Sequence, residues 1–207
     1  LFPLLVVLVV QLLDGEHGWW WSTRTALLLF FIWLQGAFHQ YIWALVLLGL
    51  LAVVSWKHFI PLLRALLGTL VISAWRILPP ILIYQQVDTE FLGGYPTAWD
   101  LLKALVVIVP PEASLEVRSN INLLAWWELD LYVGLLGCAF LLYFGVIRWA
   151  GRVRRAEGYP ELFLPLAAMV LLSIGRIYRL VMLLPVPLLT GERVSARMVL
   201  LPLVFLL

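Results

Sequence analysis

The feature that most constrains this chain is a succession of long apolar stretches joined by short polar connections. About 20 apolar residues cross a bilayer as a helix, because lipid offers the backbone no hydrogen-bond partner and each segment must bond internally. Such stretches cover residues 1–13 (in part), 24–56, 61–85, 130–149, 162–187 and 198–207 (in part). The sequence therefore predicts an all-α fold, a polytopic transmembrane helical bundle that forms one domain over residues 1–207.

Composition agrees with a membrane protein and argues against other classes. The chain is 64% hydrophobic and 13% charged, whereas soluble domains are about 45–50% apolar and about 25% charged. The net charge of +2 is small and the basic residues are dispersed, so no nucleic acid partner is expected. Cys138 is the single cysteine, which predicts neither a disulfide framework nor a Cys/His metal site. No cofactor is indicated, although a divalent metal stays open.

The terminal stretches 1–13 and 198–207 are too short to cross a bilayer. We expect the chain to be a fragment of a longer protein in which these terminal helices continue. No basic segment precedes residues 1–13 and no small-residue cleavage site follows them, so a transmembrane helix is expected there instead of a signal peptide.

The stretch 24–56 is too long for one helix perpendicular to the membrane. Its centre, Gln35 to Gln40, reads QGAFHQ, which would be costly against lipid but suits a tight turn. We therefore expect two helices, 24–36 and 39–56, with one tilted or kinked helix as the alternative.

The charge of the connections predicts an orientation. The segments Lys57 to Arg64 and Arg148 to Arg155 are short and basic, as cytoplasmic loops are, so the connection 86–129 is expected outside. Within it, Gly93 to Pro96 predicts a turn. A short outer interfacial helix is expected after it, because apolar residues recur at helical spacing: Trp99, Leu102, Leu105, Val106 and Val109.

Five arginines fall in or beside apolar stretches on the predicted outer side, where positive charge is uncommon: Arg76, Arg176, Arg179, Arg193 and Arg197. A guanidinium binds phosphate in a two-pronged geometry, so the five predict a binding site for a lipid phosphate. The alternative is that they reach to lipid head groups or pair with Glu192, Glu128 or Asp130.

Two further groups are candidate acceptor or sugar contacts. His39 and Gln40 lie at the predicted outer turn, where capping or packing is the alternative role for the histidine. Glu128 and Asp130 follow Trp126 and Trp127 at the outer mouth of a span. These carboxylates either orient a hydroxyl acceptor or pair with an arginine, and the tryptophans either stack on sugar or belong to an interfacial belt.

Several motifs in this order resemble one family: QGAFHQ at the hairpin, RILPP from Arg76, LGGYP from Leu92, WELDLYVG from Trp127 and GERVSAR ending at Arg197. Together they look like the later transmembrane half of bacterial GT-C-type membrane glycosyltransferases, with YfhO-like and other multi-spanning proteins nearest. The resemblance implies a multi-pass protein of the bacterial inner membrane, part of the cell envelope. It also implies an enzyme that moves a sugar from a polyprenyl-phosphate donor to an acceptor at the outer face.

The resemblance implies that the catalytic acidic residue lies in a first external loop, upstream of Leu1. We expect an inverting transfer in which that carboxylate activates the acceptor, while Arg176 and Arg179, with Arg76, Arg193 and Arg197, hold the departing phosphate. The expected partners are membrane lipid and a lipid-linked sugar donor. Two alternatives stay open: a transporter or flippase of lipid-linked or anionic substrates, and a non-catalytic membrane subunit.

Overall fold

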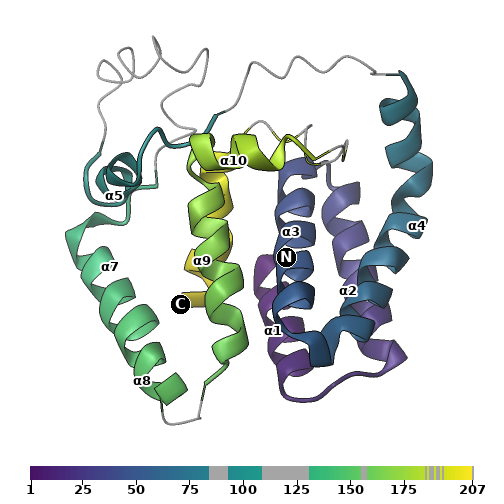
Figure 1. Ribbon diagram of the computed structural model, residues 1–207, viewed down its shortest axis with the longest axis horizontal. Coiled ribbons are helices and arrows are strands. Elements are labelled where there is room, and N and C mark those ends of the chain that lie inside the picture. The colour runs from purple at the N-terminus through teal and green to yellow at the C-terminus, as the bar shows by residue number, and fades with distance from the viewer. Residues whose placement is uncertain are drawn as a thin grey trace. The chain divides into compact units, whose positions relative to one another are not determined.

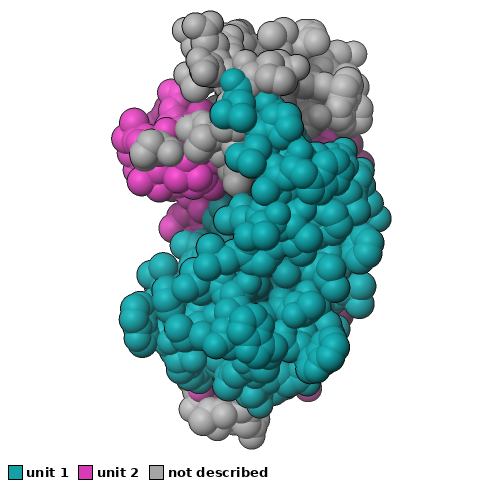
Figure 2. Space-filling view, turned by 90° about the vertical axis from the view of Figure 1, so that its right-hand side faces the viewer, with its two compact units in different colours: residues 1–86, 159–167 teal, residues 87–158, 168–207 magenta. Residues whose placement is uncertain are grey.

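The computed structural model describes residues 1–83, 93–108, 131–154, 158–184, 186, 189, 192 and 194–206. Over these residues the fold is all-helical and contains no β-strand, which confirms the predicted all-α class. The chain divides into two compact units: residues 1–86 with 159–167 form unit 1, and residues 87–158 with 168–207 form unit 2 (Figure 2). The prediction of one domain over residues 1–207 stays a prediction.

Unit 1 is built from four helices that lie side by side (Figure 1). They are α1 (Phe2–Leu13), α2 (Trp19–Leu34), α3 (Phe38–Val54) and α4 (Phe59–Ile83), followed much later in the chain by the short 3-10 helix η4 (Pro160–Leu162). A 3-10 turn, η1 (Trp56–His58), precedes α4. Helix α4 packs against both α2 and α3, and Gly68 permits this because a β-carbon there would meet Ala26 Cβ at 3.2 Å.

The polar segment at the centre of residues 24–56 forms the turn between two helices. Helix α2 ends at Leu34 and α3 begins at Phe38, so the arrangement has two helices and not one. Gly36 has a φ of +79°, a left-handed conformation that glycine adopts without strain. Helix α2 begins at Trp19, earlier than the expected residue 24, and Arg24 in its second turn pairs with Glu16 at 2.7 Å.

Unit 2 contains one long continuous helix and several short ones. Residues 134–154 run through α7 (Gly134–Phe140), a π-helical segment η3 (Leu141–Ile147) and α8 (Arg148–Arg154). The short elements are α5 (Ala98–Val106), α10 (Gly175–Val181), η5 (Ser195–Val199) and α12 (Leu200–Leu206). Helix α12 packs on η3 at Gly145, where a β-carbon would lie 2.9 Å from Leu206 Cβ.

The predicted span 162–187 is not a single helix. Helix α9 (Phe163–Leu172) ends before Ser173, and α10 begins at Gly175 and runs across the end of α9 (Figure 1). Ser173 and Ile174 leave the helical path because backbone groups of residues 173–175 pair with Tyr95 instead. Apolar composition predicted a continuous helix here, and a contact with a distant segment interrupts it.

Two of the described helices are long and apolar enough to cross a membrane, Trp56–Pro79 and Gly134–Val153. Shorter apolar helices cover Phe2–Leu13, Phe38–Val54, Pro160–Leu172 and Ser195–Leu206. This agrees with membrane association, while the number of crossings stays a prediction.

Replacement of Gly36 by alanine should destabilise the hairpin between α2 and α3. Open space surrounds Gly36, so the cost comes only from its positive φ and is about 1 kcal/mol. The measurement is the thermal unfolding of the purified protein. The control is Gly49→Ala, inside α3 and also in open space, which should stabilise by up to about 1 kcal/mol. An equal effect of the two changes would contradict the role of the turn.

Candidate functional site

Three segments of unit 2 meet through their backbones at the start of α10. The amide of Tyr95 donates to the carbonyl of Ser173 at 3.0 Å, and the amide of Gly175 donates to the carbonyl of Tyr95 at 3.0 Å. The amide of Ala196, at the start of η5, donates to the carbonyl of Gly93 at 3.0 Å. We call residues 93–95, 173–175 and 195–196 the backbone junction. It fixes α10 and η5 to one extended segment.

Glycine is required at the backbone junction because the segments approach so closely. A β-carbon on Gly94 would lie 2.4 Å from the backbone of Gly175 and 2.6 Å from Ser195 Oγ. The sequence predicted only a turn from Gly93 to Pro96, whereas residues 93–95 form the extended segment to which the other two segments of the junction bond. The pair of glycines was the available signal, since glycine also marks close backbone approach.

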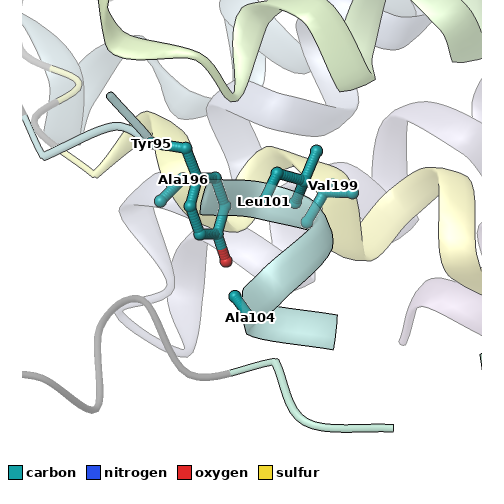
Figure 3. Close-up of a cluster of buried hydrophobic side chains, with 5 residues drawn as sticks. All are labelled: Tyr95, Leu101, Ala104, Ala196 and Val199. Carbon is teal, nitrogen blue, oxygen red and sulfur yellow. The ribbon is translucent and has the colours of Figure 1, made fainter. Parts of the chain in front are cut away.

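A small apolar core beside the junction holds α5 (Figure 3). Its members are Tyr95, Leu101, Ala104, Ala196 and Val199. Helix α5 begins at Thr97, whose Oγ1 accepts from the amide of Asp100 at 3.3 Å, which is an ordinary N-terminal cap.

The outward face of α5 carries two residues of the predicted apolar stripe. Trp99 and Leu102 are exposed, and Lys103 Nζ lies 5.7 Å from the centre of the Trp99 ring. Leu105 and Val106 are half-buried, and Val109 lies outside the described residues. The residues that hold α5 in place are thus Leu101 and Ala104, and the stripe seen in the sequence is largely free for other contacts.

Two buried polar side chains lie under α10. The hydroxyl of Tyr178 donates to the carbonyl of Leu189 at 2.9 Å, and Glu192 Oε1 accepts from the amide of Val194 at 2.8 Å. Both side chains are fully buried. Burial, and secondarily the charge of Glu192, raises the pKa of Tyr178, so the phenol stays protonated and remains a donor. Sequence reasoning considered Glu192 only as an arginine partner, because burial of a loop carboxylate has no local sequence signal.

Arg176 and Arg179 on α10 are exposed, whereas Tyr178 between them is buried. In the part of the chain that the structure describes, neither guanidinium makes a hydrogen bond or an ion pair. Leu180 and Leu183 are exposed beside them. The face therefore presents two cations, one turn apart, together with apolar surface.

The other predicted arginines differ in position. Arg197 lies half-buried on η5, directly after Ala196 of the backbone junction, and it interacts with other groups of the protein. Arg76 belongs to unit 1, where its Nη1 donates to the carbonyl of Leu34, the last residue of α2, at 3.3 Å. Such a contact caps the negative end of a helix. Arg193 lies outside the described residues.

Of the four predicted acceptor contacts, the structure describes two, His39 and Gln40. His39 packs near the rings of Phe38 and Trp43, with ring centres 5.5 Å and 6.5 Å away, and Gln40 is exposed. Glu128 and Asp130 lie outside the described residues. Among the residues that are described, no group of three His, Cys, Asp or Glu side chains is placed to hold a metal ion.

No protein-family model, curated protein or solved structure matches this chain. The likeness to GT-C-type glycosyltransferases therefore rests on the motifs in the sequence and stays a prediction.

Replacement of Gly94 by alanine should destabilise unit 2, because its β-carbon would collide with the Gly175 backbone. Overpacking of this kind typically costs about 1–3 kcal/mol. The control is Gly151→Ala in α8, where a β-carbon meets nothing within 4 Å. Thermal unfolding of both variants tests the junction, and a Gly94→Ala protein as stable as its Gly151→Ala counterpart would contradict it.

Proposed function

We propose that this chain crosses a lipid bilayer several times and is the membrane domain of a glycosyltransferase that uses a lipid-phosphate sugar donor. The membrane part is supported by the exposure of apolar side chains on helices. The donor part is supported by two arginines of α10 that have no partner in the part of the chain that the structure describes.

Helix α4 and the 3-10 turn η1 before it carry tryptophans at a spacing that suits a bilayer. Trp56 and Trp75 are 76% and 63% exposed, with exposed Ile60, Leu67 and Val71 between them. At about 1.5 Å per residue the two tryptophans are roughly 28 Å apart along the helix, close to the hydrocarbon thickness of about 30 Å. Tryptophan favours both membrane interfaces, so this pattern supports a crossing by α4.

The low burial of the two long helices supports a membrane environment over the core of a soluble fold. Only 33% of the apolar stretch within residues 56–79 is buried, and only 11% of the apolar stretch within residues 134–153. Leu135, Leu136, Leu142 and Ile147 are among the exposed residues of the second helix. Water would penalise so much exposed apolar surface, whereas lipid would not.

The arrangement of unit 2 supports an interfacial position for its short helices. Both α5 and α10 lie across the direction of the long helix formed by α7 and α8, at the end where that helix begins (Figure 1). The basic residues Arg148 and Arg152 lie toward its other end. If the basic end is cytoplasmic, α5 and α10 lie near the outer interface, where Trp99 and Leu102 would contact lipid.

The observation that carries the donor proposal is that Arg176 and Arg179 have no hydrogen-bond or ion-pair partner among the described residues. Cations without a protein counter-charge near a membrane surface suit an anionic ligand, and the guanidinium geometry suits phosphate. Arg197 lies on η5, which contacts α10, and it remains a further candidate together with Arg193, which lies outside the described residues. Arg76 has a structural contact in unit 1 and is a weaker candidate.

In the proposed reaction an acceptor hydroxyl attacks the anomeric carbon of the donor sugar. The bond between that carbon and the phosphate oxygen breaks, and its electron pair passes to the phosphate. Arg176 and Arg179 stabilise the charge that grows there. The carboxylate that takes the hydroxyl proton is expected from the resemblance to precede Leu1, and Glu128 and Asp130 remain candidate acceptor contacts.

A transporter or flippase of anionic lipids is the second candidate. The break between α9 and α10 favours it, because interrupted helices line substrate sites in many secondary transporters. Both candidates need the arginine pair, and they differ in the product: a new glycosidic bond or a ligand moved unchanged to the other leaflet.

Labelling of single cysteines tests the orientation within unit 2. In a Cys138→Ala background, Asp100→Cys on α5 and Arg152→Cys on α8 both replace residues that solvent reaches. A membrane-impermeant maleimide should label position 100 in intact cells and position 152 only after the membrane is opened. Labelling of both positions from one side would contradict a crossing by residues 134–153.

Binding of a polyprenyl phosphate to the chain in lipid nanodiscs tests the arginine pair. Charge-assisted hydrogen bonds contribute about 1.5–3 kcal/mol each, so Arg176→Gln and Arg179→Gln should each weaken binding roughly tenfold to a hundredfold. Arg152→Gln, which removes an exposed cation from the other end of unit 2, should leave the affinity unchanged.

The unphosphorylated polyprenol is the ligand control and should bind equally to all variants. Unchanged phosphate binding in both α10 variants would overturn the assigned site. In the full-length protein, a sugar-loaded donor then separates the candidates, because only a transferase forms the glycosidic product.

A further inference from the structure

Tyr178 is the residue of α10 that holds this helix most firmly to the rest of unit 2. Among the seven residues of α10, all of which the structure describes, Tyr178 alone is fully buried. Arg176 and Arg179, close to it in the sequence, are exposed. The anchor of α10 and the two cations proposed to bind phosphate are therefore carried by neighbouring residues of one short helix.

The hydroxyl of Tyr178 binds a carbonyl that is itself held in place. Its partner, the carbonyl of Leu189, also accepts from the amide of Glu192 at 3.3 Å. The carboxylate of Glu192 in turn accepts from the amide of Val194, the residue directly before η5. Because η5 is fixed to the backbone junction at Ala196, Tyr178 ties α10 to a segment whose other end is anchored.

The first residue of α10 is held by the backbone junction, through the bond from the Gly175 amide to the Tyr95 carbonyl. Glycine restricts the backbone less than any other residue, so a short helix that begins there can pivot unless a second contact fixes it. Ile177 and Val181 are only half-buried and Leu180 is exposed. Tyr178 therefore supplies the second contact.

We propose that Tyr178 is a positioning residue of the lipid-phosphate site, and that its bond to Leu189 holds α10 in the orientation in which Arg176 and Arg179 both reach the ligand. This inference rests on the proposed function, because that function supplies the ligand. Tyr178 is buried, so it acts through the two arginines. Without its hydroxyl, α10 would take up more than one orientation, and the apparent affinity would fall with the fraction of molecules in the competent one.

Tyr178→Phe removes the hydroxyl and keeps the buried ring. The carbonyl of Leu189 retains the amide of Glu192 as a donor, so no buried group loses its last partner and the variant should fold. The matched control is Tyr143→Phe, because Tyr143 lies on η3 and is exposed. Thermal unfolding of both variants checks that each is folded.

Binding of polyprenyl phosphate to the chain in lipid nanodiscs measures the positioning role. Tyr178→Phe should weaken binding roughly threefold to tenfold, the factor that one neutral hydrogen bond supplies, whereas Tyr143→Phe should not change it. Unphosphorylated polyprenol should bind equally to both variants. In a protein that also carries Arg176→Gln and Arg179→Gln, Tyr178→Phe should cause no further loss, because no guanidinium of α10 is left to orient.

Cysteine labelling measures the orientation of α10 without a ligand. In a Cys138→Ala background, Arg179→Cys should react with a maleimide faster than Ile177→Cys, because position 179 is exposed and position 177 is half-buried. Tyr178→Phe should lower the ratio of the two rates by roughly threefold, in proportion to the lost hydrogen bond. Tyr143→Phe should leave the ratio as it is in the parent protein.

The outcomes separate this inference from the proposed function. If the arginine variants weaken phosphate binding and Tyr178→Phe does not, the positioning role is overturned and the proposed function stands. An equal loss from Tyr178→Phe in the absence of both arginines would also overturn it, because Tyr178 would then act on unit 2 in general. An unchanged labelling ratio excludes Tyr178 as the residue that orients α10. If the arginine variants bind phosphate as the parent does, both proposals fail.

Discussion

Unit 2 depends on the backbone hydrogen bonds that Tyr95 makes with Ser173 and Gly175. A helix that breaks inside an apolar run leaves amides and carbonyls without partners, and an unpaired buried peptide group costs several kcal/mol in a lipid-like environment. The extended segment at residues 93–95 supplies those partners. The break between α9 and α10 is therefore stable, and α10 is free to run across the end of α9 instead of continuing it.

The helical class and most helix positions could be predicted, because apolar length and polar interruptions are local properties of the sequence. The hairpin at Gly36 is an example, since the polar residues and the glycine that form the turn are adjacent. The break at Ser173 is the opposite case. The residues around Ser173 are as apolar as those of a continuous span. The helix breaks because of contacts with residues 93–95, and no local sequence pattern connects that segment with Ser173.

The candidate site was predictable by residue type and not by geometry. Arginines in apolar surroundings identified Arg176 and Arg179, but the sequence cannot show that Arg76 donates to the end of α2 in another unit. Nor does it show the buried Tyr178 and Glu192 beneath α10, because burial of polar groups depends on long-range packing. The chemistry of each side chain follows from the sequence, whereas the fold determines which side chains pair with one another.

The cations of the described residues differ in how they are paired, and this difference is the basis for proposing an anionic ligand at α10. At one end of unit 1 the cations are matched: Arg24 by Glu16, Lys57 by Glu161 and Arg64 by the Trp19 ring. In a chain with only 13% charged residues, such matching limits the cost of charge near lipid. Arg152 also lacks a partner among the described residues, but it belongs to the basic segment that the sequence predicts to be cytoplasmic. The preference of cytoplasmic loops for basic residues does not explain Arg176 and Arg179 on α10, at the opposite end of unit 2 from Arg152. A negatively charged ligand or head group would provide the counter-charge that the described residues do not.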